Sequence, residues 1–288
     1  MTASKSRFAT SPPNFHEVSD YPLSPQVYNQ SMTVCIAAIA DEGKSLIIAA
    51  DQMATMPHLV AENEGNHKIF ELSNNIYLLA AGSGFNAHKV YNNAKGSSVR
   101  ASTVGDWVLK IQTAYKQIKL YTAENMFLAP RGLQDFQDYL NRHGSLNNQV
   151  VALIDSQLMS GDHFQEHFIV TGVDPSGNAS VYIIQPPGEF GQINDFVAIG
   201  SGQSHASNSL YARGYSINMT EKEATYLVFE AKRRAEKAPG VGKATDMIVV
   251  SKSGKAKNLT EAEIDKLDTL YNEVMKGEKD LLTKKLSK

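Results

Sequence analysis

Cysteine is almost absent from this sequence, because Cys35 is the single cysteine among 288 residues. A lone cysteine excludes an intramolecular disulfide framework and any cysteine-rich zinc site. It also fits a reducing compartment, so we expect a cytoplasmic protein.

Long hydrophobic runs are missing as well. No stretch approaches the ~18 consecutive apolar residues of a membrane span, and the N-terminus lacks the pattern of a secretory signal. Charge of either sign is not in excess, with 28 Lys plus Arg against 30 Asp plus Glu. No general basic field is therefore available to attract nucleic acid or an anionic membrane. We expect neither of them as a partner.

Motifs that bind metals or phosphates are also missing. The 8 histidines are scattered, and the one close pair with ligand-like spacing, His163 and His167, has no carboxylate motif to complete it. "GSG" occurs at 82–84 and at 200–202, but neither copy continues into a phosphate-binding loop. We expect no metal and no cofactor.

The chain does contain strongly patterned segments. Residues 1–31 hold four of the prolines and no sustained hydrophobic period, so we expect residues 1–32 to be a leader or propeptide-like extension. From residue 33, "TVCIAAIA" and "SLIIAA" flank the turn "DEGK", and both runs are apolar enough to be buried on two faces. "HKIFEL" and "IYLLAAGSG" flank "SNN" and predict a second hairpin.

Helices and further strands follow. Residues 86–150 are mostly helical in period, with one apolar face formed by Trp107, Ile111, Ala114, Tyr115 and Ile118. The segments "NQVVALID", "EHFIVTGVD", "ASVYIIQ" and "DFVAIGSG" are interpreted as strands, and "ATDMIVVS" as a last strand. Between them, a capping box at Thr220 and Glu223 begins a helix. This order favours an α+β fold in which sheets pack against helices, and not a regular βαβ repeat.

A charged tail, residues 255–288, ends the chain. Thr260 and Glu263 form another capping box, and the helix that follows has an apolar stripe at Ile264, Leu267, Tyr271 and Val274. Packing of this stripe on its own domain is the favoured interpretation, and binding of a partner is the alternative.

Three residues suggest a catalytic group: Thr33, Asp51 and Lys68. A threonine hydroxyl is a poor nucleophile, and a threonine at the start of a chain can use its own α-amine as the base. A nearby lysine ammonium would favour the alkoxide, and an aspartate would orient that lysine. Asp51 ends one predicted strand and Lys68 begins another. The alternative is that neither residue has a catalytic role, since Asp at a strand end often caps a turn and Lys at a strand end is often solvated.

Several blocks of the sequence, in this order, resemble one family. "TVCIAAIADEGKSLIIAADQMAT", "HKIFELSNNIYLLAAGSGFNA", "FIVTGVDPSGNASVYIIQPPGEFGQINDFVAIGSGQSHA" and "VGKATDMIVV" are similar to the β subunits of proteasomes and their bacterial homologues, which are N-terminal nucleophile hydrolases. The resemblance covers residues 33–254. It implies a four-layer αββα sandwich, made of two antiparallel sheets flanked by helices, that hydrolyses peptide bonds through an N-terminal threonine.

The resemblance also assigns roles by position. It places Thr33 on the nucleophile, Asp51 and Lys68 on the acidic and basic residues beside it, and Ser201 on the serine next to the threonine amine. Gly82 falls where a backbone N–H helps to form the oxyanion hole. Cys35 falls near the site, where we expect it to be a small buried side chain. The implied partners are peptide or unfolded-protein substrates, further copies of the chain in a ring or spiral, and an ATP-driven unfoldase.

The sequence departs from the family pattern at three places. Met53 replaces an arginine that many active relatives have, "PGVG" at 239–242 replaces an Asp-x-x-Ser motif, and Met32 stands where the family usually has glycine. Thr33 becomes the first residue either if translation starts at Met32 and this methionine is then removed, or if the 32-residue leader is cut. Two alternatives to a peptidase stay open. One is a catalytically silent, proteasome-like structural subunit, and the other is an amide hydrolase that acts on small molecules.

Overall fold

Two five-stranded antiparallel sheets form the centre of the molecule. The computed structural model describes residues 33–56, 59–161 and 163–287, so the predicted leader lies outside the described residues. The first sheet has the order β10 (Phe196–Ile199), β1 (Cys35–Ala40), β2 (Ser45–Asp51), β11 (Thr245–Val250) and β12 (Ala256–Asn258). The second has the order β5 (Ile69–Ser73), β6 (Ile76–Ala81), β7 (His167–Val173), β8 (Ala179–Gln185) and β9 (Glu189–Ile193).

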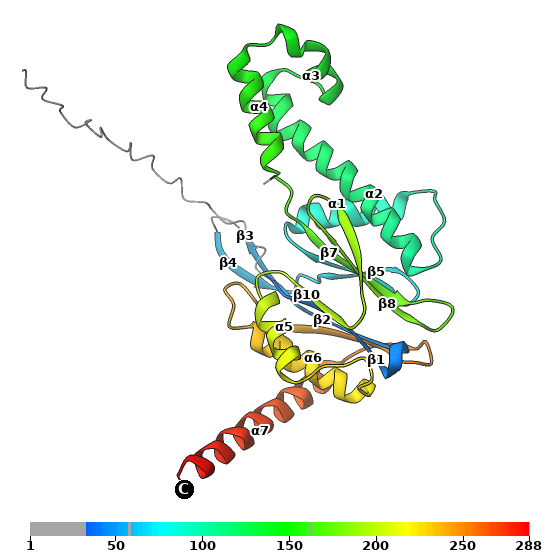
Figure 1. Ribbon diagram of the computed structural model, residues 1–288, viewed down its shortest axis with the longest axis vertical. Helices are drawn as coiled ribbons and strands as arrows, with labels where there is room; N and C mark the ends of the chain where they lie inside the picture. Colours follow the sequence, from blue (N-terminus) through cyan, green and yellow to red (C-terminus); the bar gives the residue numbers. More distant parts are fainter. Residues whose placement is uncertain (1–32, 57–58, 162, 288) are drawn as a thin grey trace, which may run out of the picture.

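Helices cover the outer face of each sheet (Figure 1). The helices α5 (Gln203–Ala212) and α6 (Glu221–Ala235) pack on the first sheet, and α1 (Gly84–Gly96) and α2 (Val104–Ala123) pack on the second. Apolar side chains of the two inner faces form the core between the sheets. The predicted αββα sandwich is therefore confirmed.

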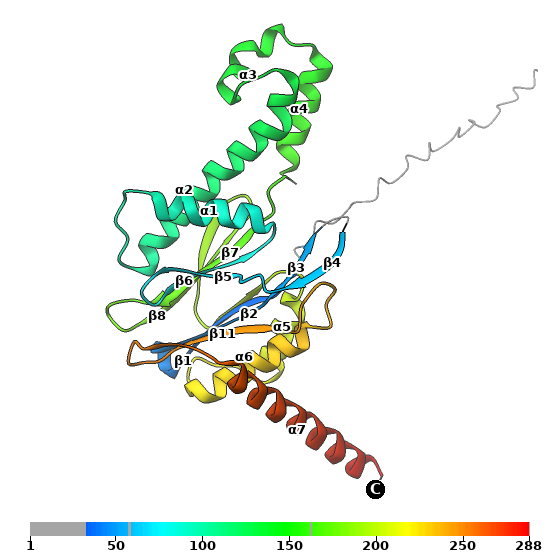
Figure 2. The same ribbon diagram turned by 180° about the vertical axis from the view of Figure 1, so that it is seen from behind.

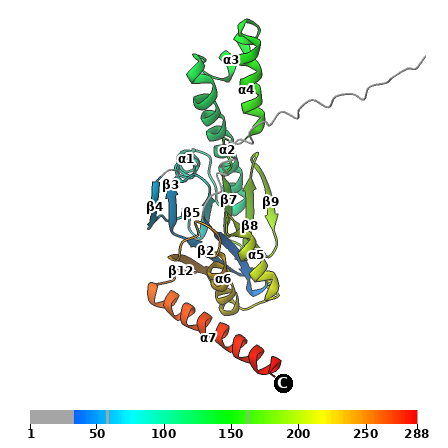
Figure 3. The same cartoon turned by 90° about the vertical axis from the view of Figure 1, so that its left-hand side faces the viewer.

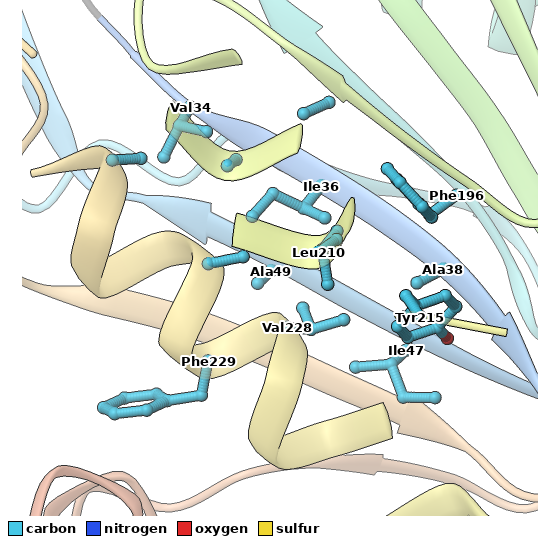
Figure 4. Packing of buried hydrophobic residues seen from close by; sticks show 14 of the residues in the cluster. Val34, Ile36, Ala38, Ile47, Ala49, Phe196, Leu210, Tyr215, Val228 and Phe229 are labelled. Carbon is cyan, nitrogen blue, oxygen red and sulfur yellow. The ribbon is translucent and has the colours of Figure 1, made fainter. Parts of the chain in front are cut away.

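Strand β1 shows why the opening apolar run is buried on both faces. Its even-numbered side chains, with Val34 just before the strand, lie in one cluster with Leu210 of α5 and Val228 of α6 (Figure 4). Its odd-numbered side chains, such as Ala37, face the second sheet. Since alternate residues of a strand point to opposite faces, a strand between two layers must be apolar throughout.

One predicted strand is wrong. "NQVVALID" begins the helix α4 (Asn148–Ser160), which is capped by the Asn147 side chain accepting a hydrogen bond from the Gln149 N–H. Val150, Ile154 and Leu158 recur at the helical spacing of four and pack with Tyr139 in a small separate core. A short apolar run cannot be assigned to helix or strand by its period alone, and the Asn cap and this remote helical core decide for the helix.

Helix α4 belongs to a helical extension that projects away from the sandwich (Figures 1 and 3). From the end of α2 the chain passes through a π-helical turn, Glu124–Leu128, and a 3₁₀ turn, Ala129–Arg131. It then forms α3 (Phe136–Arg142), a 3₁₀ turn at His143–Ser145, and α4. Pro130 lies in the 3₁₀ turn that separates the π-helical turn from α3.

The remaining elements frame the sandwich. A 3₁₀ turn (Asp41–Gly43) joins β1 to β2, and a separate hairpin of β3 (Met53–Met56) and β4 (Leu59–Glu64), which the sequence pattern did not predict, follows β2.

The C-terminal helix α7 (Glu261–Leu286) points outward from α6 (Figure 2). Both predicted capping boxes are present. Ile264, Leu267 and Tyr271 pack against the α5–α6 core, as the apolar stripe predicted. In the described part of the chain, no helix has both the length and the apolarity to cross a membrane.

Candidate active site

Three chain segments bring the predicted catalytic residues together at one end of the sandwich. Thr33 lies two residues before β1, Asp51 ends β2, and Lys68 immediately precedes β5 of the facing sheet. Strands β1 and β2 are antiparallel with Cys35 opposite Ala50, and the Asp51 N–H donates to the Val34 carbonyl at 3.2 Å. This register places the start of one strand beside the end of the other.

The side chains of Thr33, Asp51 and Lys68 form a closed triangle of hydrogen bonds. Thr33 Oγ1 donates to Asp51 Oδ1 at 2.5 Å. Lys68 Nζ donates to Asp51 Oδ1 at 2.8 Å and also donates to Thr33 Oγ1. Asp51 is 0% exposed and Thr33 is 3% exposed. The ammonium and the hydroxyl are thus held in contact away from most of the solvent, where electrostatic interactions are stronger than in water.

Backbone N–H groups hold the Asp51 carboxylate from the other sides. Its Oδ1 accepts from the Val34 N–H at 2.9 Å, and its Oδ2 accepts from Met53 at 3.1 Å and from Gly242 at 2.9 Å. A buried carboxylate needs such partners to offset the loss of water. With them in place, Asp51 has one fixed orientation toward Lys68.

Ser201 lies beside the main chain of Thr33. The Thr33 nitrogen donates to Ser201 Oγ at 3.2 Å, and the same Oγ lies 3.4 Å from the Thr33 carbonyl oxygen and 3.2 Å from that of Pro239. The neighbouring Gly200 has φ +94°, and a Cβ there would lie 2.3 Å from the Thr33 oxygen. Ser201 therefore contacts the nitrogen that becomes the α-amine when Thr33 is the first residue. Only glycine fits at position 200, directly before Ser201.

The segment at 239–242 contributes its backbone to the site. It lacks the family's Asp-x-x-Ser side chains, yet the Pro239 carbonyl faces Ser201 and the Gly242 N–H bonds to Asp51. A Cβ on Gly242 would lie 2.7 Å from Met53 Cβ and 3.1 Å from the Met53 nitrogen. Sequence reasoning missed this contribution, because hydrogen bonds from the main chain leave no side-chain signature. Two glycines within four residues were the one available signal.

Replacement of Gly242 tests this close approach. We expect Gly242→Ala to lower the free energy of unfolding by about 1–3 kcal/mol, because the methyl group must displace Met53 or the loop. Urea unfolding followed by circular dichroism measures the change. Gly277→Ala in the exposed α7 is the control, because nothing lies within 4 Å of a Cβ there. An equal stability for Gly242→Ala and wild type would contradict the described packing.

Gly82 comes directly after β6, at the same end of the sandwich. Cys35 Sγ donates to the Ala80 carbonyl at 3.5 Å, which holds the end of β6 against the start of β1. Gly82 has φ +139°, and a Cβ on it would lie 2.9 Å from Glu166 Cγ. Glycine is thus required there by conformation and by space, while its part in an oxyanion hole stays a prediction.

Cys35 is fully buried next to the candidate catalytic residues, as expected for a small core side chain. Burial raises the pKa of its thiol to about 12. Because the thiolate is the reactive form, we expect iodoacetamide at mildly alkaline pH to leave Cys35 unmodified in the folded protein and to alkylate it after unfolding in urea. Intact-mass measurement distinguishes the two results. Rapid alkylation without urea would show that the site is more open than described.

Metal-binding groups are not apparent in the parts of the chain that the structure describes. Within residues 33–56, 59–161 and 163–287, no group of three or more His, Cys, Asp or Glu side chains is placed to hold a metal ion. His163 packs edge to face on Phe127, and burial lowers the pKa of His167.

Comparison with known proteins gives two matches. The family model described as "Proteasome subunit" matches residues 128–250. The chain is also 25% identical over 237 residues to a protein named "Proteasome subunit beta" from Methanopyrus kandleri, an alignment that spans 82% of this chain and 94% of the relative. Both matches, together with the αββα sandwich, show that the chain is similar to proteasome subunits, and over most of its length to a proteasome β subunit.

Proposed function

We propose that the protein is a threonine peptidase in which Thr33, once it is the first residue, is the nucleophile. The observation that carries the proposal is the triangle of Thr33, Asp51 and Lys68, with Ser201 at the Thr33 nitrogen. A structural subunit has no chemical need for a buried hydroxyl held between an ammonium and a carboxylate. The similarity to proteasome subunits supports the same class of reaction.

In the proposed reaction, the free α-amine of Thr33 takes the proton from Oγ1 as that oxygen attacks the substrate carbonyl carbon. The C–N bond then breaks, and the leaving amine receives the proton. This leaves an acyl ester on Thr33, which a water molecule hydrolyses with the same amine as base. An N-terminal amine has an ordinary pKa of about 7.7–8.0, so a useful fraction is neutral at physiological pH.

The other residues of the site stabilise charge in this scheme. Lys68 donates to Thr33 Oγ1 and so favours the alkoxide as the proton leaves. Asp51 holds Lys68, and Ser201 orients the Thr33 nitrogen. The Gly82 N–H is proposed to bind the oxyanion, an interaction whose loss commonly lowers kcat by about 10²–10³-fold.

The test is hydrolysis of short fluorogenic peptides by protein whose intact mass equals residues 33–288. Turnover supports the proposal. Correctly trimmed protein that hydrolyses neither peptides nor small acyl-amides would point to a silent structural subunit. Protein from which Met32 is never removed would point to the same alternative, because its threonine amine stays blocked. Turnover of acyl-amides but not of peptides would point to a small-molecule amide hydrolase.

We further propose that the protein works as a homo-oligomeric ring or spiral that confines these sites. Several helices carry exposed apolar side chains, among them Leu109 of α2, Leu140 of α3 and Met159 of α4, which are 56%, 51% and 86% exposed. Exposed apolar groups of this kind are typical of protein interfaces. In this proposal the particle acts on peptides or unfolded proteins in the cytoplasm, with an ATP-driven unfoldase as its partner.

Assembly is tested by size-exclusion chromatography with light scattering. We expect a mass well above that of a dimer, because a monomer would leave these helical faces in contact with water. The mass of a single chain throughout the micromolar range would contradict the ring or spiral.

A further inference from the structure

A buried lysine, Lys232, lies next to the 239–242 segment that borders the candidate active site. Lys232 of α6 is 0% exposed and is among the largest fully buried side chains of the described residues. Lysine is rarely buried to this extent unless its ammonium has partners. Its position therefore calls for a structural or functional reason.

The ammonium of Lys232 bonds to both ends of one short segment. Nζ donates to Glu236 Oε1 at 2.7 Å and to the Lys243 carbonyl at 2.6 Å. The chain between these two partners includes Pro239 and Gly242, whose backbone groups contact Ser201 and Asp51. Lys232 thus ties together the two ends of the segment that borders the site.

The segment continues to contact the site beyond Lys243. The Gln52 N–H donates to the Ala244 carbonyl at 3.3 Å, directly after Asp51. A displacement of the segment would therefore remove a donor from Asp51 and the carbonyl facing Ser201 at the same time. The side chains that relatives use at this place are absent from "PGVG", so the backbone must be held where it is by something else.

The ion pairs around Lys232 reach the C-terminal helix. Glu236 Oε2 accepts from Arg233 Nη1 at 2.5 Å, and Arg233 Nε lies 2.8 Å from Asp268 Oδ1 of α7. Lys232 is the innermost member of this series and Asp268 is the outermost. The series gives the buried ammonium a charged partner, Glu236, which is itself held by Arg233.

We propose that Lys232 is a positioning residue for the reaction of Thr33, because it clamps the segment 236–243 so that its backbone holds Asp51 and Ser201. This inference rests on the proposed function for its catalytic consequence. The clamping itself is a property of the fold and can be measured without any turnover. The Lys232 ammonium bonds to Glu236 and to the Lys243 carbonyl, so in this proposal it acts through the segment.

The test compares Lys232→Met with Lys237→Met, both in protein beginning at Thr33. Methionine keeps the length of the side chain but removes the charge and the donors. Lys237 is an exposed lysine of the same segment and serves as the matched control. Hydrogen–deuterium exchange of peptides covering 238–245, which include the Gly242 N–H, reports the order of the segment. Peptide turnover reports kcat and KM separately.

For Lys232→Met we expect faster exchange in 238–245 and a kcat lowered by roughly 10- to 100-fold, because small displacements of a site cost this much. We expect KM to stay within about threefold, since Lys232 does not meet the substrate. The Lys237→Met control should match wild type in both measurements. Wild-type exchange in 238–245 of the Lys232→Met protein would overturn the proposal, whatever its activity.

A second variant covers the case in which Lys232→Met does not fold. Lys232→Met alone leaves the Glu236 carboxylate partly buried without its lysine partner, which destabilises the fold. Replacement of both charged side chains by apolar ones is often tolerated. The double variant Lys232→Met with Glu236→Met should fold and still show faster exchange in 238–245, and unchanged exchange would again overturn the proposal. Absence of turnover in wild type would refute the peptidase proposal alone, because the exchange experiment still decides whether Lys232 clamps the segment.

Discussion

Protein that retains residues 1–32 is expected to hydrolyse no peptide, and protein that begins at Thr33 is expected to be active. The reason is that the proposed base is the α-amine of Thr33, and a peptide bond to Met32 converts that amine into an amide that cannot accept a proton at neutral pH. In the chain that carries residues 1–32 the Thr33 nitrogen already lies 3.2 Å from Ser201 Oγ, so the expected inactivity of this form comes from the amide bond and not from the position of the nitrogen. Intact-mass measurement, combined with turnover of a fluorogenic peptide, relates the N-terminus to the activity.

Two variants of Thr33 sharpen this test. In protein that begins at residue 33, Thr33→Ala should be inactive because it keeps the amine and loses the hydroxyl. Thr33→Ser should retain part of the activity, since it keeps both groups. A fully active preparation in which every molecule still carries residues 1–32 would end the N-terminal threonine mechanism for this protein.

Loss of Lys68 should have a comparably large effect. Lys68→Ala removes the ammonium that donates to Thr33 Oγ1 and to Asp51 Oδ1. We expect peptide turnover to fall by at least about 10²-fold, the scale seen when one preorganised donor to a developing charge is lost. Lys68→Arg should fail as well, because a planar guanidinium does not fit the place of a compact ammonium at a closely packed site. Turnover by the trimmed variants is measured with the same fluorogenic peptides.

The fold must survive for the Lys68 result to be informative. Asp51 keeps three backbone N–H donors in Lys68→Ala, so the buried carboxylate is still hydrogen-bonded and the oligomer should remain assembled. Light scattering and circular dichroism check both points. Lys252→Ala, at an exposed turn before β12, is the matched control and should behave as wild type. Unchanged turnover in Lys68→Ala would remove Lys68 from the mechanism.

Local patterns were sufficient to predict much of the sandwich. The length and the unbroken apolar character of the runs identified β1 and β2, and the capping boxes at Thr220 and Thr260 identified the starts of α6 and α7. Such signals succeed because each depends on neighbours within a few residues. The run at 148–155 was wrongly predicted as a strand, because the residues that stabilise it as a helix lie outside the run, in a separate core around Tyr139. The β3–β4 hairpin left no clear period to read.

The sequence alone determined which residue types stood at the strand ends, and the resemblance to one family suggested their roles. Only the tertiary structure decided that Thr33, Asp51 and Lys68 touch, because their contact depends on the register of β1 against β2 and on the packing of one sheet upon the other. The support from Gly242 and Pro239 was likewise invisible in the sequence. It is made by backbone atoms, which every residue carries, so their use is set by where the chain passes and not by which side chains it bears.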